Sequence, residues 1–258
     1  MGFEQKLLRA VVALSLLTSS CSSRPKHRAR VLAPLTAPSW RTELPVKGFG
    51  PAMVALPLGA TSARPIAVVL HGAHDRAEWQ CGSFRGLLGG HVFIVCPEGV
   101  VQSAAGGFYG LGSFDDSGAE LRAALGALKA RFGAYVASGP ILLIGYAEGA
   151  AVAADLARQE PSFFARVALV NGDSTAFTPS ATKIYAERGG KRVLFFCLDQ
   201  ACEVEGGERA RLLSRAGVPS KVILAKVGPY LDPPFVDALR SQLPWLVEGD
   251  ARWATSHR

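Results

Sequence analysis

The segment around residue 147 most constrains what this chain can fold into. A short apolar run, Ile141 to Ile144, leads directly into Gly145-Tyr146-Ala147-Glu148-Gly149, and a helical stretch of small residues begins at Ala150. A strand that enters a helix through two glycines, each two places from the central residue, predicts a sharp turn in which a side chain at either glycine would collide with the neighbouring strand or helix. The residue at the apex of this turn is an alanine.

Strand-like apolar runs alternate with helical patterns along most of the chain. Strands are expected over residues 66–70, 92–96, 141–144, 167–170, 193–196 and 221–227, and helices over 113–132, 150–158, 208–216 and 235–243. Ser113, followed three residues later by Asp116, predicts an N-cap for the first of these helices. The alternation predicts one α/β domain with a mostly parallel central sheet and helices on both faces.

Two motifs extend this interpretation. His71-Gly72 follows an early strand, and the glycine-flanked turn at residue 147 comes about seventy residues later, in the order that such folds require. From about Met53 to Trp245 the chain resembles the α/β-hydrolase superfamily, particularly its compact serine esterases and depolymerases. The resemblance implies the α/β-hydrolase fold and a nucleophile, carboxylate and histidine at three defined positions.

The residues at these positions depart from what acyl transfer needs. Ala147 occupies the nucleophile position, and its methyl group can neither attack a carbonyl carbon nor be activated by a base. Asp199 occupies the acid position, while the base slot near Pro229 lies in a loop without histidine. The resemblance places the oxyanion donors at the backbone N–H groups of Ala73 and Glu148, which do not depend on side chains. A small carbonyl or anionic ligand is therefore expected as a partner of the remaining pocket.

No other residue replaces the missing base convincingly. The chain has five histidines, at positions 27, 71, 74, 91 and 257, and only His257 follows the last expected strand. His257 lies beyond the closing helix, on what is expected to be a frayed tail. Glu148 is an alternative base for a water molecule, but its side chain starts one residue past the apex and should point away from it.

The N-terminus has the layout of a bacterial export signal. Residues 1–20 carry two basic residues, then an apolar stretch over residues 11–17, then small residues that lead to Cys21. This layout resembles a lipoprotein signal in which Cys21 becomes the lipid-modified first residue, and ordinary secretory cleavage near Ser20 is the alternative. We therefore expect a signal peptide at 1–20, a lipid-anchored basic tether at 21–43 and the hydrolase-like domain at 44–258. The expected location is the outer membrane or the periplasmic face, or otherwise the secreted fraction.

Charge and cysteine content fit an exported protein. Most of the formal charge of +7 lies in residues 22–43, which carry five basic residues against one acidic residue. This basic run suits anionic lipid head groups or a solvated linker, and it lacks the interleaved aromatic residues of nucleic-acid binders. Four further cysteines predict two disulfides in an oxidising compartment, Cys81 with Cys96 and Cys197 with Cys202. Their spacing does not suit zinc, and neither a metal nor a cofactor is expected.

Three functions remain open. The first is a catalytically degenerate envelope lipoprotein that uses the hydrolase fold as a binding or scaffold module. The second is a secreted serine-type esterase with a non-standard catalytic set, in which Ser113 or Ser174 is the nucleophile. The third is a structural cell-wall protein in which the basic tether acts and the domain is a spacer.

Overall fold

The computed structural model describes residues 32–103 and 108–254. The expected signal peptide, the lipid-attachment residue Cys21, His27 and His257 lie outside these residues. Among the residues described, no helix is both long and apolar enough to cross a membrane.

The centre of the domain is an eight-stranded sheet with the order β1-β2-β4-β3-β7-β8-β9-β10. Strands β1 and β2 are antiparallel to their neighbours, and all other pairs are parallel. Every residue of β3 is buried, as expected for a parallel strand covered on both faces. The strands are β1 (Arg41–Leu44), β2 (Ala52–Ala55), β3 (Ile66–Leu70), β4 (Phe93–Cys96), β7 (Leu142–Tyr146), β8 (Arg166–Val170), β9 (Arg192–Cys197) and β10 (Ser220–Leu224).

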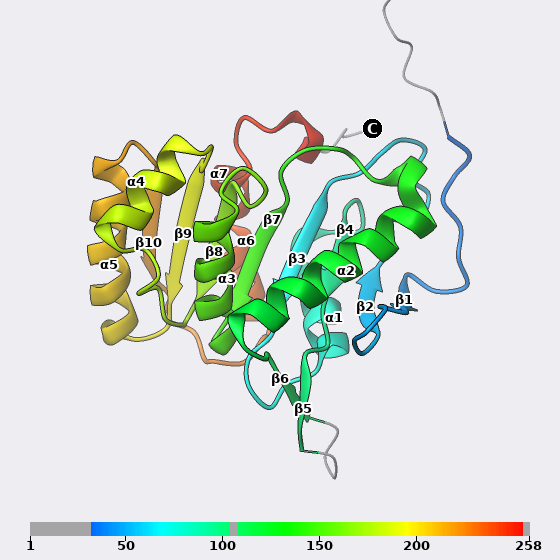
Figure 1. The fold of residues 1–258 in the computed structure, drawn as a ribbon, viewed down its shortest axis with the longest axis horizontal. Helices are drawn as coiled ribbons and strands as arrows, with labels where there is room; N and C mark the ends of the chain where they lie inside the picture. The colour runs from blue at the N-terminus through cyan, green and yellow to red at the C-terminus, as the bar shows by residue number, and fades with distance from the viewer. Residues whose placement is uncertain (1–31, 104–107, 255–258) are drawn as a thin grey trace, which may run out of the picture. The chain divides into compact units, whose positions relative to one another are not determined.

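Helices cover both faces of this sheet (Figure 1). One face packs against α2 (Phe114–Phe132), α3 (Glu148–Gln159), α4 (Pro179–Glu187) and α5 (Gln200–Arg215). The other packs against α1 (Ala77–Leu88), α6 (Pro233–Arg240) and α7 (Leu243–Leu246). Two single-turn 3₁₀ helices, η1 (Gly133–Tyr135) and η2 (Ala251–Trp253), and a separate hairpin of β5 (Val100–Ser103) and β6 (Phe108–Gly110) complete the described structure.

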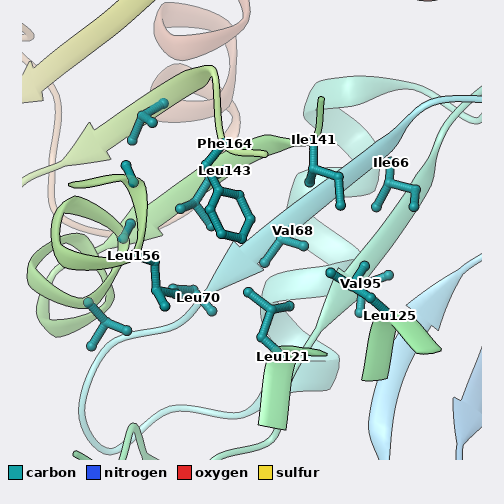
Figure 2. Close-up of a cluster of buried hydrophobic side chains, with 14 of the residues drawn as sticks. Ile66, Val68, Leu70, Val95, Leu121, Leu125, Ile141, Leu143, Leu156 and Phe164 are labelled. Carbon is teal, nitrogen blue, oxygen red and sulfur yellow. The ribbon is translucent and has the colours of Figure 1, made fainter. Parts of the chain in front are cut away.

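The α2–α3 face carries the larger apolar cluster, part of which is shown in Figure 2. Val68 and Leu143, from the adjacent strands β3 and β7, lie in the same cluster as Leu121 of α2 and Leu156 of α3. All four side chains are almost completely removed from solvent, which contributes about 1.5–3 kcal/mol for each such residue. This packing fixes β7 and α3, and therefore the turn between them, in the middle of the domain.

The prediction of a mostly parallel α/β sheet with helices on both faces is confirmed. Ser113 caps α2 by accepting a hydrogen bond from the Asp116 backbone N–H, as its position predicted. The folded unit begins earlier than residue 44, the domain start that the sequence predicts. Leu35 is buried in the core, and β1 pairs with β2 from Arg41 onward.

The predicted disulfides are both present. Cys81–Cys96 joins α1 to the end of β4, and Cys197–Cys202 joins the end of β9 to the first turn of α5. Each bond therefore ties a helix to a strand end close to it in the chain. Such cross-links fit an oxidising, extracytoplasmic compartment.

Candidate functional site: the turn between β7 and α3

The turn between β7 and α3 has a backbone geometry that few residues adopt. Ala147, at its apex, has φ +50° and ψ −116°, and it immediately precedes the first turn of α3. Such a sparsely populated conformation costs about 1–3 kcal/mol and persists only where surrounding structure enforces it. Two backbone bonds hold it: the Ala147 N–H donates to the Val170 carbonyl oxygen at 2.9 Å, and the Ala147 carbonyl accepts from Ala150 at 3.0 Å.

The two glycines of the turn are required by close backbone contacts, as the sequence predicted. A Cβ atom on Gly145 would overlap the carbonyl oxygen of Gly149 on α3. A Cβ atom on Gly149 would overlap the carbonyl oxygen of Leu70 at the end of β3. The strand, the turn and the helix are therefore in close backbone contact around an apex that carries a methyl group.

The segment after β3 lies against this apex. A Cβ atom built on Gly72 would stand 3.2 Å from the Ala147 methyl carbon. Ala73 follows and is exposed, as is Glu148 on the other side of the apex. Within the described residues, neither the Ala73 nor the Glu148 backbone N–H donates a hydrogen bond to the protein. These two N–H groups, which the sequence predicts as oxyanion donors, thus have no partner among the described residues.

His71 is fully buried and bonded at both ring nitrogens. Nδ1 lies 2.7 Å from the Gly72 carbonyl oxygen, and Nε2 lies 2.8 Å from the Glu98 carbonyl oxygen. Both ring nitrogens are therefore engaged by backbone carbonyl groups, and which of them donates depends on the tautomer. His71 joins the loops after β3 and β4.

The loop after β10 approaches the elbow without supplying a base. The Tyr146 hydroxyl donates a hydrogen bond to the carbonyl oxygen of Pro229, the residue nearest the predicted base slot. The Tyr146 ring also packs edge-on against Phe235 of α6, with ring centroids 6.1 Å apart. Burial, and next the charge of Asp75, raise the pKa of the Tyr146 hydroxyl, which therefore stays protonated at neutral pH. The loop is held by a tyrosine that precedes the apex.

Asp199, at the predicted acid position, has a structural role in this fold. Its side chain caps α5 by accepting a hydrogen bond from the Cys202 backbone N–H at 2.9 Å, and the residue is exposed. Asp199 and the Cys197–Cys202 disulfide therefore fix the same turn of chain at the start of α5.

Known proteins resemble this chain in structure and not in sequence. No protein-family model and no curated protein sequence matches it. A fluorophosphonate-binding serine hydrolase of Staphylococcus aureus matches with a TM-score of 0.60 and 12% identity, over 80% of this chain and 97% of that one. A ferulic acid esterase matches with a TM-score of 0.56 and 14% identity, over 80% and 96% of the two chains. The chain has the α/β-hydrolase fold.

A third solved structure resembles this chain to a similar degree. A poly(aspartic acid) hydrolase from a Sphingomonas species matches with a TM-score of 0.56 and 12% identity, over 80% of this chain and 98% of that one. At this level of identity the likeness establishes the fold, and the site must be judged from its own residues.

Two carboxyl groups at the loop after β4, one buried and one half-buried, are not predicted from the sequence. Glu120 of α2 is almost completely buried and accepts a hydrogen bond from the Gly99 backbone N–H at 3.0 Å. Glu98, in the same loop, is half-buried. Burial is the main cause that raises the pKa of both carboxyl groups, although the Tyr109 hydrogen bond to Glu98 and the Gly99 bond to Glu120 oppose it. Both groups belong to the surroundings of the loop after β4, which His71 joins to the loop after β3.

The larger surface hollows lie away from the apex of the turn between β7 and α3. Five hollows on the described surface have volumes of 170 to 780 Å³. None of these five is lined by Ala147, Ala73 or Glu148. The Glu148 side chain lies beside the loop before α2, where Oε2 is 3.4 Å from the Leu111 backbone nitrogen.

Proposed function

We propose that this protein is an exported, lipid-anchored member of the α/β-hydrolase-fold group that does not hydrolyse, and that it acts as a binding or scaffold module of the cell envelope. The observation that carries the proposal is the methyl group of Ala147 at the apex of an otherwise complete elbow. Acyl transfer on this fold needs a nucleophilic side chain at this position. The strained backbone is retained here without the group that makes it useful in catalysis.

The surroundings of the apex support the absence of turnover. The loop after β10 contains no histidine, and its Pro229 carbonyl is bonded to Tyr146. His71 is bonded at both ring nitrogens, and His91 precedes β4, at the edge of the sheet opposite the elbow. Asp199, at the position of the carboxylate that would orient a catalytic histidine, caps α5 instead. Three separate requirements of the triad chemistry are thus unmet.

The esterase alternative is less well supported because both candidate serines have structural partners. The Ser113 hydroxyl caps α2 and donates to the Asp116 carboxylate at 2.6 Å. The Ser174 hydroxyl is buried and donates to the Glu205 carboxylate at 2.8 Å. A serine nucleophile needs a neighbouring base that in turn is oriented by a third group, and a helix cap or a buried carboxylate bond does not supply one.

The binding role rests on the backbone groups that the substitutions leave intact. The Ala73 and Glu148 N–H groups flank the apex, and such paired donors suit a carbonyl oxygen or a small anion. The two disulfides agree with export, and the predicted lipid at Cys21 together with the basic segment that follows would supply two signals for stable membrane attachment.

Activity is tested by incubating the purified protein with short-chain aryl esters beside an active serine esterase of the same fold. We expect no hydrolysis above the rate of the buffer alone. Site-localised turnover that disappears on Ala147→Val, and persists in the surface variant Val204→Ala, would contradict the proposal, because the elbow would then be a working site.

Anchoring is tested separately, by mass spectrometry of the N-terminal peptide of protein recovered from the membrane fraction of an expressing bacterium. The expected first residue is Cys21 carrying acyl chains, and Cys21→Ser should release the protein from that fraction. An unmodified peptide that begins at another residue would contradict the lipid anchor and leave the absence of catalysis untouched.

A further inference from the structure

An apolar groove lies at the edge of the sheet opposite the elbow. It has a volume of 400 Å³ and lies between the end of α1, the α6–α7 segment and η2. His91 lines the groove and comes just before β4, whereas Ala147 comes just after β7. Strands β4 and β7 run parallel in the sheet. The groove therefore belongs to the amino edge of the strands, and the elbow belongs to the carboxyl edge.

The walls of this groove are almost entirely aliphatic. Leu87 and Leu88 form part of it and are each 4% exposed, and Leu243 and Val247 line it from the α7 segment. The indole of Trp253 contributes an aromatic wall. Ligand sites commonly have volumes of about 300–1,000 Å³ and apolar walls with few polar groups. This groove meets that description at the small end of the range.

Among the described residues that line the groove, the polar side chains are Arg240 and His91, and none is a carboxylate. Two contacts hold the Arg240 guanidinium at the rim: Nη2 donates to the Gly86 carbonyl oxygen at 2.7 Å, and Nη1 donates to Asp237. A guanidinium has five N–H donors, so donors remain after these two bonds. Burial, and next the charge of Arg64, lower the pKa of His91, which leaves its ring neutral at pH 7. The groove thus combines an aliphatic floor with a guanidinium that is paired with Asp237 and keeps further N–H donors.

We propose that this groove binds a single-chain aliphatic carboxylate, with the chain against Leu87, Leu88 and Val247 and the carboxylate at Arg240. The lining excludes a hydrophilic ligand because it offers few hydrogen-bond partners, and the remaining guanidinium donors of Arg240 favour a carboxylate head over a neutral one. This site is separate from the elbow and does not depend on the proposed absence of catalysis.

The test is calorimetric titration of the full chain with decanoate and with 1-decanol, both below the concentrations at which they aggregate. We expect one saturable decanoate site, with the alcohol bound about tenfold more weakly because it lacks the charge-assisted bond to Arg240. Arg240→Gln should weaken decanoate about tenfold and leave decanol unchanged, and unchanged decanol binding would itself show that the variant is folded.

A second variant tests the location. Val247→Trp fills the groove and should abolish binding of both ligands, whereas Val204→Trp, at an exposed position of α5, should change neither. Equal affinity for decanoate and decanol, or full binding by Val247→Trp, would overturn the proposal. So would binding that appears only after residues 255–258 are removed, or a dimer that buries this groove, because the natural occupant would then be the chain itself.

Discussion

The Tyr146 hydroxyl donates a hydrogen bond to the Pro229 carbonyl oxygen across 83 positions of sequence. This bond joins the residue before the elbow apex to the loop in which an active hydrolase of this fold would carry its histidine. The contact therefore ties the loop after β10 to the residue that precedes Ala147.

Tyr146→Phe removes this bond and keeps the ring against Phe235. The free energy of unfolding should fall by about 1 kcal/mol, the usual net contribution of one hydrogen bond, and the loop of residues 225–232 should lose protection. Urea unfolding measures the first effect, and hydrogen exchange of the loop amides measures the second. As a control, Tyr230→Phe alters a tyrosine that is 76% exposed and should change neither. Unchanged loop protection in Tyr146→Phe would show that the bond does not hold the loop.

Gly149→Ala tests whether close packing explains the elbow. The new methyl group would overlap the Leu70 carbonyl oxygen, so the free energy of unfolding should fall by about 1–3 kcal/mol, as for other overpacked sites. Gly126→Ala is the matched control, because Gly126 lies within α2 and an added Cβ atom meets nothing within 4 Å. This control should gain about 1 kcal/mol from helix propensity. Equal effects of the two substitutions in urea unfolding would refute the packing argument.

Glu120→Gln tests the effect of burial on a carboxyl group. Burial raises the pKa of Glu120 above its ordinary value of 4.5, so the folded protein holds this proton more tightly than the unfolded chain. The contribution of protonated Glu120 to the free energy of unfolding is therefore fully present below pH 4.5, and it is lost as pH rises through the folded-state pKa. Wild type should lose more free energy of unfolding between pH 4.5 and 7 than Glu120→Gln.

The residual slope in Glu120→Gln would come partly from Glu98, whose pKa burial shifts in the same direction. Glu187→Gln, on the exposed surface of α4, serves as the control and should retain the wild-type slope. Parallel pH profiles for wild type and Glu120→Gln would contradict the assignment.

Local signals in the sequence predicted the framework of the fold and the elbow. The strand at Ile66–Leu70 is fully apolar, and the Ser113 cap lies three residues from its partner, so both can be seen within a short window. The elbow was visible for the same reason, since Gly145 and Gly149 flank Ala147. The closing helix was expected to be continuous over residues 235–243, whereas α6 ends at Arg240 and α7 begins at Leu243.

Contacts between distant residues could not be predicted in this way. The bond from Gly99 to Glu120 spans 21 positions, and nothing in the local pattern of α2 marks this glutamate as buried. Asp199 was placed correctly after β9, but its helix cap depends on where α5 begins, and the predicted helix started eight residues later. The groove at Arg240 requires the end of α1 and η2 to meet, which only the folded chain brings about.

The central claim is that the elbow presents no nucleophile because its apex is alanine and no base stands beside it. It is tested most directly by intact-mass measurement after exposure to a fluorophosphonate, a probe that labels activated serines. Four proteins are compared: wild type, Ala147→Ser, Pro229→His and the double variant. Triad residues act as a unit, so we expect the adduct at position 147 only in the double variant and none in the other three. A stoichiometric fluorophosphonate adduct on the wild-type protein would contradict the account.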